Sequence, residues 1–371
     1  MMQVLSEKKM FSADEIALLL QHTKNMIGPY GLYQHATIQT PLLSEGYCTD
    51  DNARAIQALL HLKKIAAPQT HDEIETIIES CWQFILAAEE KPGVYYNFRS
   101  AQGEWLLHGR SDDMYARLFR SLAAVLAHDT QHQRQAHAAA LLPPLARTLK
   151  KLTSARAWAE ILIAVTEFPA IERASYQELV AIGVQKLRAL WHANASIDWP
   201  WFESTITYAN ALFPHALLRA QSLTHAADLP LILRQSADWL ITTTIRDGMF
   251  VPIGSNGWYT KGGQPSVDNQ QPIEAGQTFD FLLDYSVYTD IDEAIMLAPY
   301  LWLYGKNTHQ FSLVDPARGY CRDGLLATGP NLNCGAESLL AYLWAEIRLK
   351  QAIPELQTIA AEQRKAITAT V

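Results

Sequence analysis

The sequence predicts an all-α fold, an (α/α)6 toroid in which an inner ring of six helices lies inside an outer ring of six. Three observations lead to this prediction. Apolar residues recur with the period of a helix in twelve segments. Long and short connections alternate between these segments. No repeat of fixed period, as an α-solenoid would show, is found, which leaves an irregular helical bundle as the other alternative.

The helical segments follow one another along nearly the whole chain. They cover residues 13–27, 50–66, 72–89, 112–128, 131–150, 154–166, 171–193, 208–223, 228–246, 273–287, 290–304 and 335–350, with one more at 354–366. Short connections make consecutive helices antiparallel neighbours. The connections before the even-numbered segments are long, except 151–153, so we expect these long loops at one end of the ring. They are 28–49, 90–111, 194–207, 247–272 and 305–334.

Residue size and charge assign the segments to the two rings. Even-numbered segments are rich in small residues, as in 53–56 and 334–341, whereas odd-numbered ones carry surface charge, as in 71–75. The even-numbered segments are therefore expected inside. The 371 residues, 49% of them hydrophobic, suffice for a large core. Because no linker divides the chain, we expect one domain, 1–371, with 354–371 as a C-terminal extension.

Charge and composition narrow the range of partners. The formal net charge of −8 argues against nucleic acid or an anionic membrane surface, and no apolar run reaches membrane-spanning length. Residues 1–9 lack the apolar core of a signal peptide, which predicts a cytoplasmic location. The cysteines lack metal-site spacing and predict reduced structural thiols, with no metal and no cofactor. They are Cys48, Cys81, Cys321 and Cys334.

Two acidic turns open the second and fourth helical segments. Each has a hydroxyl residue at the expected N-cap, two acids behind it, and an arginine four residues after one acid. The residues are Thr49, Asp50, Asp51 and Arg54 in the first turn, and Ser111, Asp112, Asp113 and Arg117 in the second. Such turns stabilise any helix through capping and charge pairs. They also suit acid–base chemistry, because paired carboxyl groups in different environments divide into a protonated acid and an ionised base.

The loops 194–207 and 247–272 gather aromatic, amide and acidic side chains. Flat aromatic faces suit the apolar faces of sugar rings, and carboxylates and amides suit hydroxyl groups, although a loop folded over its tryptophans would need no ligand. The predicted sugar platforms are Trp199, Trp201, Trp258 and Tyr259. The other predicted substrate-binding residues are His35, Asp50, Arg54, Tyr208, Asn210, Gln270, Gln271 and Glu337.

Several motifs together resemble a bacterial family of helical-toroid proteins that accompany, or are fused to, glycosyltransferases and mannoside-processing enzymes. They are YGLYQHA at 30–36, GYCTDDNARA at 46–55, WPWFE at 199–203, NGWY at 256–259, QQPIEA at 270–275 and NCGAES at 333–338. The resemblance implies a toroid, a sugar or oligosaccharide ligand and a glycosyltransferase as a partner. Where that family has Glu-Asp-Ser-His-Gly-Arg, this chain departs, at 110–117. The turn at 112–115 is also similar to unsaturated glucuronyl and rhamnogalacturonyl hydrolases.

The leading hypothesis is a glycoside hydrolase that acts on a short oligosaccharide. Glycosidic cleavage commonly uses two carboxylic groups across the scissile bond, one as acid and one as base or nucleophile. Asp51 and Glu203 are the predicted catalytic pair. Asp113, Asp268 and Glu274 are the reserve candidates.

Three other functions fit the same fold. A sugar epimerase or isomerase would use a histidine as base, for which His35 and His215 are the candidates. A lyase acting on uronic-acid glycans would need basic groups, and the acid-rich face argues against it. A glycan-binding partner of a glycosyltransferase would keep the tryptophans and tolerate loss of the acids. Fold alone does not choose among these functions.

Overall fold

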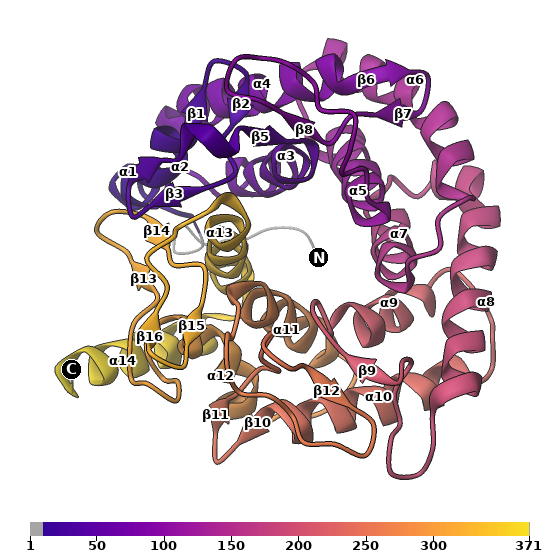
Figure 1. The fold of residues 1–371 in the computed structure, drawn as a ribbon, viewed down its shortest axis with the longest axis vertical. Helices are drawn as coiled ribbons and strands as arrows, with labels where there is room; N and C mark the ends of the chain where they lie inside the picture. The colour runs from indigo at the N-terminus through magenta and orange to yellow at the C-terminus, as the bar shows by residue number, and fades with distance from the viewer. Residues whose placement is uncertain (1–9, 371) are drawn as a thin grey trace.

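A ring of helices closes on itself in the computed structural model, which describes residues 10–370 (Figure 1). Six helices form the inner wall, and each packs against the next, the last against the first. They are α3 (Thr49–Lys63), α5 (Asp112–His128), α7 (Ala155–Glu167), α9 (Leu212–Ala220), α11 (Pro272–Tyr285) and α13 (Ala336–Gln351). These are the six segments predicted for the inner ring, so the (α/α)6 toroid is confirmed.

The outer wall consists of helices that return the chain from one inner helix to the next. They are α1 (Ala13–Leu19) with α2 (Gln21–Met26), α4 (His71–Ala88), α6 (His132–Leu149), α8 (Gln177–Asn194), α10 (Leu229–Thr244) and α12 (Glu293–Leu303). The helix predicted at 13–27 is divided at Leu20, whose φ of −92° and ψ of −1° end α1 and begin α2. Neither proline nor glycine marks this break, so the apolar period alone did not reveal it.

The C-terminal helix α14 (Pro354–Thr370) lies outside the two rings and packs against α12 and α13. Its Leu356 and Ala360 are buried in the common hydrophobic core. The four cysteines are buried and unbridged, as predicted. Within residues 10–370, no helix combines the length and apolarity that crossing a membrane requires. Residues 1–9, on which the predicted location rests, lie outside the described residues.

Short strands in the loops form eight two-stranded antiparallel ladders within the described part of the chain. Six of these ladders are hairpins, each formed within one loop. They are β1 (Ile27–Gly28) with β2 (Gly31–Leu32), β3 (Ala36–Thr37) with β4 (Thr40–Pro41), β6 (Glu89–Lys91) with β7 (Val94–Tyr95), β10 (Ile245–Arg246) with β11 (Met249–Phe250), β13 (Val314–Asp315) with β14 (Tyr320–Cys321), and β15 (Leu325–Leu326) with β16 (Gly329–Pro330).

The other ladders join loops that are far apart in the sequence. β5 (Tyr47–Cys48) pairs with β8 (Phe98–Arg99), and β9 (Thr205–Ile206) pairs with β12 (Tyr259–Thr260). Single bridges from Asn333 to Thr37 and from Leu325 to Gln270 connect the loop before α13 to its two neighbours. The long loops therefore form a collar around one mouth of the ring, made of residues 27–48, 89–111, 195–211, 245–271 and 304–335.

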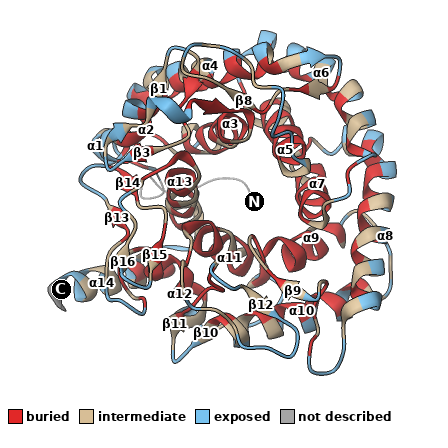
Figure 2. Ribbon diagram, in the orientation of Figure 1, coloured by how far each residue is buried: buried red, intermediate tan, exposed pale blue. Residues whose placement is uncertain are grey.

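Burial explains why the inner helices carry small residues. The inner helices are buried almost throughout, whereas the outer helices expose their outward faces (Figure 2). Small side chains let neighbouring inner helices approach one another. At Gly276, for example, an added Cβ would lie 2.9 Å from the carbonyl oxygen of Ala341, so glycine permits the close contact between α11 and α13.

Candidate active site

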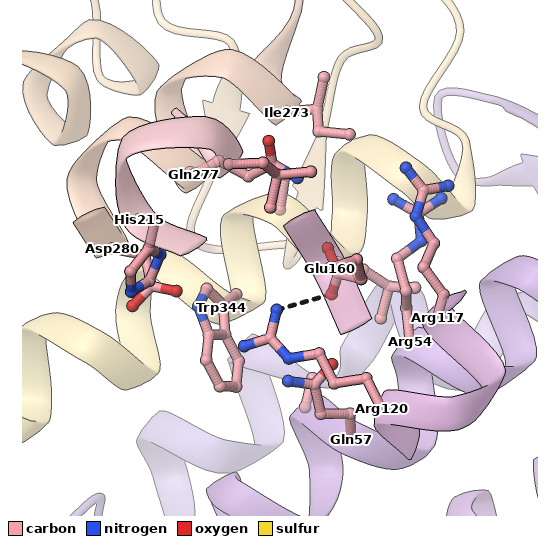
Figure 3. Close-up of a pocket in the computed structure, with 15 residues that line it drawn as sticks. Arg54, Gln57, Arg117, Arg120, Glu160, His215, Ile273, Gln277, Asp280 and Trp344 are labelled. Atoms are coloured by element: carbon pink, nitrogen blue, oxygen red, sulfur yellow. Dashed lines mark hydrogen bonds and ion pairs between the residues drawn. The ribbon is translucent and has the colours of Figure 1, made fainter. Parts of the chain in front are cut away.

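A cavity lies in the centre of the ring, and all six inner helices line it (Figure 3). Its volume is about 680 Å³, counted together with the space that opens to solvent. The lining side chains that carry charge or polar atoms are Arg54, Gln57, Arg117, Arg120, Glu160, His215, Gln277, Asp280 and Trp344. Because every inner helix contributes, the cavity exists only when the ring is closed.

Arg54 connects this cavity to the acidic turn at the start of α3. Its guanidinium nitrogens lie 3.2 Å from Asp50, 2.6 Å from Asp51 and 3.3 Å from Glu337. Burial works to raise the pKa of Asp50, but Arg117 and Arg54 outweigh burial and lower it. Burial raises the pKa of Asp51 in spite of Arg54. The two neighbouring carboxyl groups therefore differ in how readily they ionise.

The first acidic turn is capped differently from the prediction. Cys48, not Thr49, is the N-cap of α3, and its sulfur accepts a hydrogen bond from the backbone N–H of Asp51. Thr49 already belongs to the helix, and its hydroxyl donates to the carbonyl of Tyr96 at 2.6 Å. The predicted pair of Asp50 and Arg54 is present. The cap was mispredicted because the hydroxyl found a partner in the neighbouring loop.

The second acidic turn has the predicted cap but not the predicted charge pair. Ser111 caps α5 by accepting a hydrogen bond from the backbone of Met114. Arg117 pairs with Asp50 on α3 instead of with Asp113. Asp113 accepts hydrogen bonds from the hydroxyls of Tyr208, at 2.8 Å, and Ser154, at 3.0 Å. Arg117 and Asp113 therefore pair with residues of neighbouring elements and not with each other.

His215 lies on α9, the inner helix opposite α3 in the ring (Figure 1). Its Nε2 is 2.7 Å from Oδ2 of Asp284, and Asp284 also pairs with Arg348, at 2.6 Å, and with Arg219. Burial works to raise the pKa of Asp284, but the hydrogen bond with His215 and the two arginines outweigh it, so this carboxylate stays ionised. Among residues 10–370, none forms a hydrogen bond with Nδ1 of His215. That nitrogen is available for proton exchange.

The carboxylate of the predicted catalytic residue Glu203 forms an ion pair with an arginine. Both carboxylate oxygens contact Arg156, at 3.1 and 2.9 Å. Arg156 also lies over the ring of Tyr208, 4.6 Å from its centroid, and donates to the Tyr208 carbonyl. Tyr208 in turn reaches Asp113. A bidentate guanidinium contact fixes the position of the carboxylate and occupies both of its oxygens, which suits a structural role for Glu203 better than proton transfer.

Glu274 is buried in the first turn of α11 and holds the segment that leads into α9. Its carboxyl group accepts hydrogen bonds from the backbone of Ala209 and from the side chain of Asn210, the latter at 2.9 Å. Ala209 has a φ of 53°, in the left-handed region, so these contacts hold a strained turn in place. Burial raises the pKa of Glu274 to about 7, in spite of these hydrogen bonds. It is therefore partly protonated near neutral pH.

The tryptophans of the loop 194–207 do not offer an open face to a ligand. Trp199 and Trp201 are 2% and 0% exposed and pack around Trp239. The Trp199 indole also donates to the Glu203 carbonyl at 2.8 Å. Tyr259, which is half-buried in β12, stacks on Trp239 and meets Trp199 edge-on, and Trp258 is half-buried with a φ of 54°. The sugar-platform prediction is therefore wrong for Trp199 and Trp201, because folding the loop onto its own core uses their faces.

The remaining predicted residues are dispersed over the collar. Gln270 is fully buried, and its Oε1 accepts the indole N–H of Trp302 at 2.8 Å, so its amide is used structurally. Gln271 is the half-buried N-cap of α11, and Asp268 is half-buried in the collar. His35 is half-exposed, with Nδ1 4.0 Å from Oδ2 of Asp323. The pairing of Asp51 with Glu203 across one glycosidic bond stays a prediction.

Sequence reasoning missed most of the cavity wall. The site was predicted in the long loops and at the helix starts, whereas much of the wall comes from the middle of inner helices. These residues are Gln57, Arg120, Glu160, Gln277 and Asp280. The available signal was their spacing. Polar residues recur three or four positions apart on helices predicted to be buried, as in Gln277 and Asp280, and such a polar stripe faces either an ion-pair network or a ligand.

Comparisons with solved structures identify the fold class. No protein-family model matches the sequence, and no curated protein matches it significantly. A cellobiose 2-epimerase from Bacillus thermoamylovorans B4167 matches with a TM-score of 0.68 at 11% identity, over 91% of this chain and 97% of that one. A D-mannose isomerase matches with 0.65 at 11%, over 95% and 100%. An α-1,6-mannanase variant of Salegentibacter sp. HEL1_6 matches with 0.58 at 10%, over 91% and 98%. These similarities, at 10–11% identity, establish the (α/α)6 toroid as the fold.

Proposed function

We propose that the protein is a sugar isomerase that moves a proton between C2 and C1 of an open-chain sugar inside the central cavity. The observation that carries this proposal is His215, the one histidine among the cavity-lining residues, held at Nε2 by Asp284 and unbonded at Nδ1 within residues 10–370. A general base needs a ring held in a fixed orientation and a nitrogen that is free to take a proton, and His215 has both.

The chemistry follows from these groups. Nδ1 removes the proton from C2 of an aldose, the electron pair of the C–H bond forms the C1–C2 double bond, and the π electrons of the C1 carbonyl move to O1 to give an enediolate. Guanidinium N–H groups of Arg54, Arg117 and Arg120 that their ion pairs leave unused donate hydrogen bonds to the enediolate oxygen. The hydroxyl proton moves from O2 to O1, and the imidazolium returns its proton to C1. One base suffices for this transfer, whereas epimerisation at C2 needs a second proton donor on the opposite face.

Two further findings support isomerisation over the predicted hydrolysis. The carboxylates of Asp50 and Asp51 on α3 and of Glu203 in the collar are ion-paired with arginines. In addition, the TM-scores with an isomerase and with epimerases, 0.65 to 0.68, exceed those with α-mannanases, 0.57 and 0.58, although this similarity concerns the fold alone. Hydrolysis of a short oligosaccharide remains the second candidate, because Glu274, with its pKa raised to about 7, has the property of a general acid. A glycosyltransferase partner is proposed from the resemblance only.

Deuterium exchange distinguishes the two candidates. Wild type, His215→Asn and the matched control His192→Gln, whose exposed imidazole lies on the outer helix α8, are incubated in D2O with free aldoses and with manno- and gluco-oligosaccharides. We expect wild type and the control to form ketose with deuterium at C1 and to return aldose with deuterium at C2, and His215→Asn to be slower by about 10²–10⁴-fold. Equal rates for His215→Asn and wild type would exclude His215 as the base. Release of monosaccharides without isotope exchange would favour the hydrolase.

A further inference from the structure

Gln277 has an unusual position in the cavity wall. It lies on α11, one turn after Ile273 and three residues before Asp280, and all three line the cavity. Its Oε1 is buried, and no residue among 10–370 donates a hydrogen bond to it or accepts one from its amide nitrogen. Figure 3 shows Gln277 on the side of the cavity across from Arg120 and Trp344, with no contact drawn to another lining residue.

The other amide and charged side chains of the wall already have partners. Gln57 donates to Glu167 at 3.1 Å, and Arg120 pairs with Glu160 at 2.7 Å. Arg54, Arg117 and Asp280 each have at least one ion pair, and His215 is hydrogen-bonded to Asp284. An amide oxygen that is buried without a hydrogen-bond partner costs stability and is rare in native proteins, so each such group calls for an explanation. Gln277 therefore stands apart as a group whose partner is the ligand.

From this contrast, we infer that Gln277 recognises one hydroxyl group of an uncharged sugar and sets the specificity of the cavity. Its Oε1 accepts a hydrogen bond and its Nε2 donates one, and a hydroxyl offers both complements. An anionic sugar would instead need a cationic side chain whose charge is not already balanced by carboxylates of the protein. In this wall Arg54 already faces Asp50, Asp51 and Glu337, and Arg120 faces Glu160 and Glu167. The inference rests on the proposed function only in taking the ligand to be a sugar. It concerns binding and does not depend on turnover.

The test measures binding of a panel of free hexoses, their monodeoxy analogues and a hexose 6-phosphate by calorimetry. We expect wild type to bind one neutral hexose, and to bind one of its monodeoxy analogues about tenfold more weakly, since a site built around a hydroxyl leaves its own polar group unpaired when the hydroxyl is missing. Gln277→Leu should bind hexose and that analogue equally, both near the weaker value. Gln83→Leu, an exposed position on the outer helix α4, should keep the wild-type preference.

Thermal unfolding of the ligand-free proteins separates recognition from structure. Gln277→Leu should unfold at the wild-type temperature or above it, because an apolar side chain replaces an unpaired polar one; a drop of several degrees would assign Gln277 a structural role and overturn the inference. Gln277→Met serves the same purpose if the leucine variant does not fold.

The two proposals fail separately. The same preference among the sugars in wild type and Gln277→Leu, tighter binding of the phosphate, or no binding of any neutral hexose by wild type would overturn the role of Gln277. Hexose binding that depends on Gln277 without any isotope exchange would overturn only the isomerase proposal.

Discussion

Replacing Glu274 by glutamine should remove a pH dependence of stability that the native fold imposes. Glu274 is 4% exposed, and burial raises its pKa from 4.5 to about 7. Between these pH values the unfolded chain loses the proton while the folded chain keeps it. The unfolded state then binds fewer protons, so the free energy of unfolding falls as pH rises.

The magnitude follows from the separation of the two pKa values. At about 1.4 kcal/mol for each pH unit, the interval from 4.5 to about 7 amounts to about 3 kcal/mol of lost stability. Glu274→Gln is neutral at every pH and lacks this dependence. It has its own constant cost of about 1–3 kcal/mol, since its amide nitrogen cannot accept the hydrogen bonds that one carboxylate oxygen receives from Asn210.

Urea unfolding at a series of pH values from 4.5 to 8 measures this effect. From pH 4.5 to 8, the free energy of unfolding of the wild type should fall by about 3 kcal/mol relative to that of Glu274→Gln. The variant should therefore gain stability relative to the wild type as pH rises. Glu178→Gln is the control, because that carboxylate is 66% exposed and pairs with Lys150 at the surface, where such pairs contribute little. A difference between wild type and Glu274→Gln that stays constant with pH would show that burial does not hold the proton on Glu274.

Three further substitutions test the packing and the ion pairs. Arg54→Met should lower the unfolding free energy by about 3–5 kcal/mol at pH 7 and by less at pH 4, where Asp51 takes up a proton; equal losses in urea unfolding at both pH values would contradict this account. Trp201→Ala should cost about 3–5 kcal/mol and leave hexose affinity in calorimetry unchanged, whereas a selective loss of affinity would restore the sugar-platform prediction. Gly276→Ala should cost about 1–3 kcal/mol in urea unfolding by pushing α11 from Ala341, and a neutral effect would mean that the helices separate freely.

The ring was predictable from the sequence because its signals are local and repeated. The apolar period, the small residues near Ala53 and the alternation of loop lengths each report on one helix or one connection, and together they define the toroid. The break at Leu20 escaped because neither a proline nor a glycine marks it in the sequence.

The candidate site was less predictable because the role of a polar residue depends on its partner. Trp201 and Gln270 have the composition of a sugar site, but the collar uses the indole face and the amide for its own folding. Conversely, Gln277 looks like an ordinary helix residue, and only the closed ring shows that its amide faces a cavity without a partner. Sequence spacing identifies which residues share a helix face; it does not show which of them satisfy one another.

Closure of the ring by α13 against α3 has a consequence for how the chain is made. The contact between Arg54 and Glu337 joins residues 283 positions apart. At a ribosomal rate of about 5–20 residues per second, the first inner helix waits roughly 15–55 s for its last neighbour. During that interval nothing covers the side of α3 that packs against α13 in the folded protein, and residues such as Asp51 that are buried in the closed ring stay exposed. The cavity is therefore the last part of the molecule to come into existence, and a nascent chain that has completed five-sixths of its ring still has no place to bind a ligand.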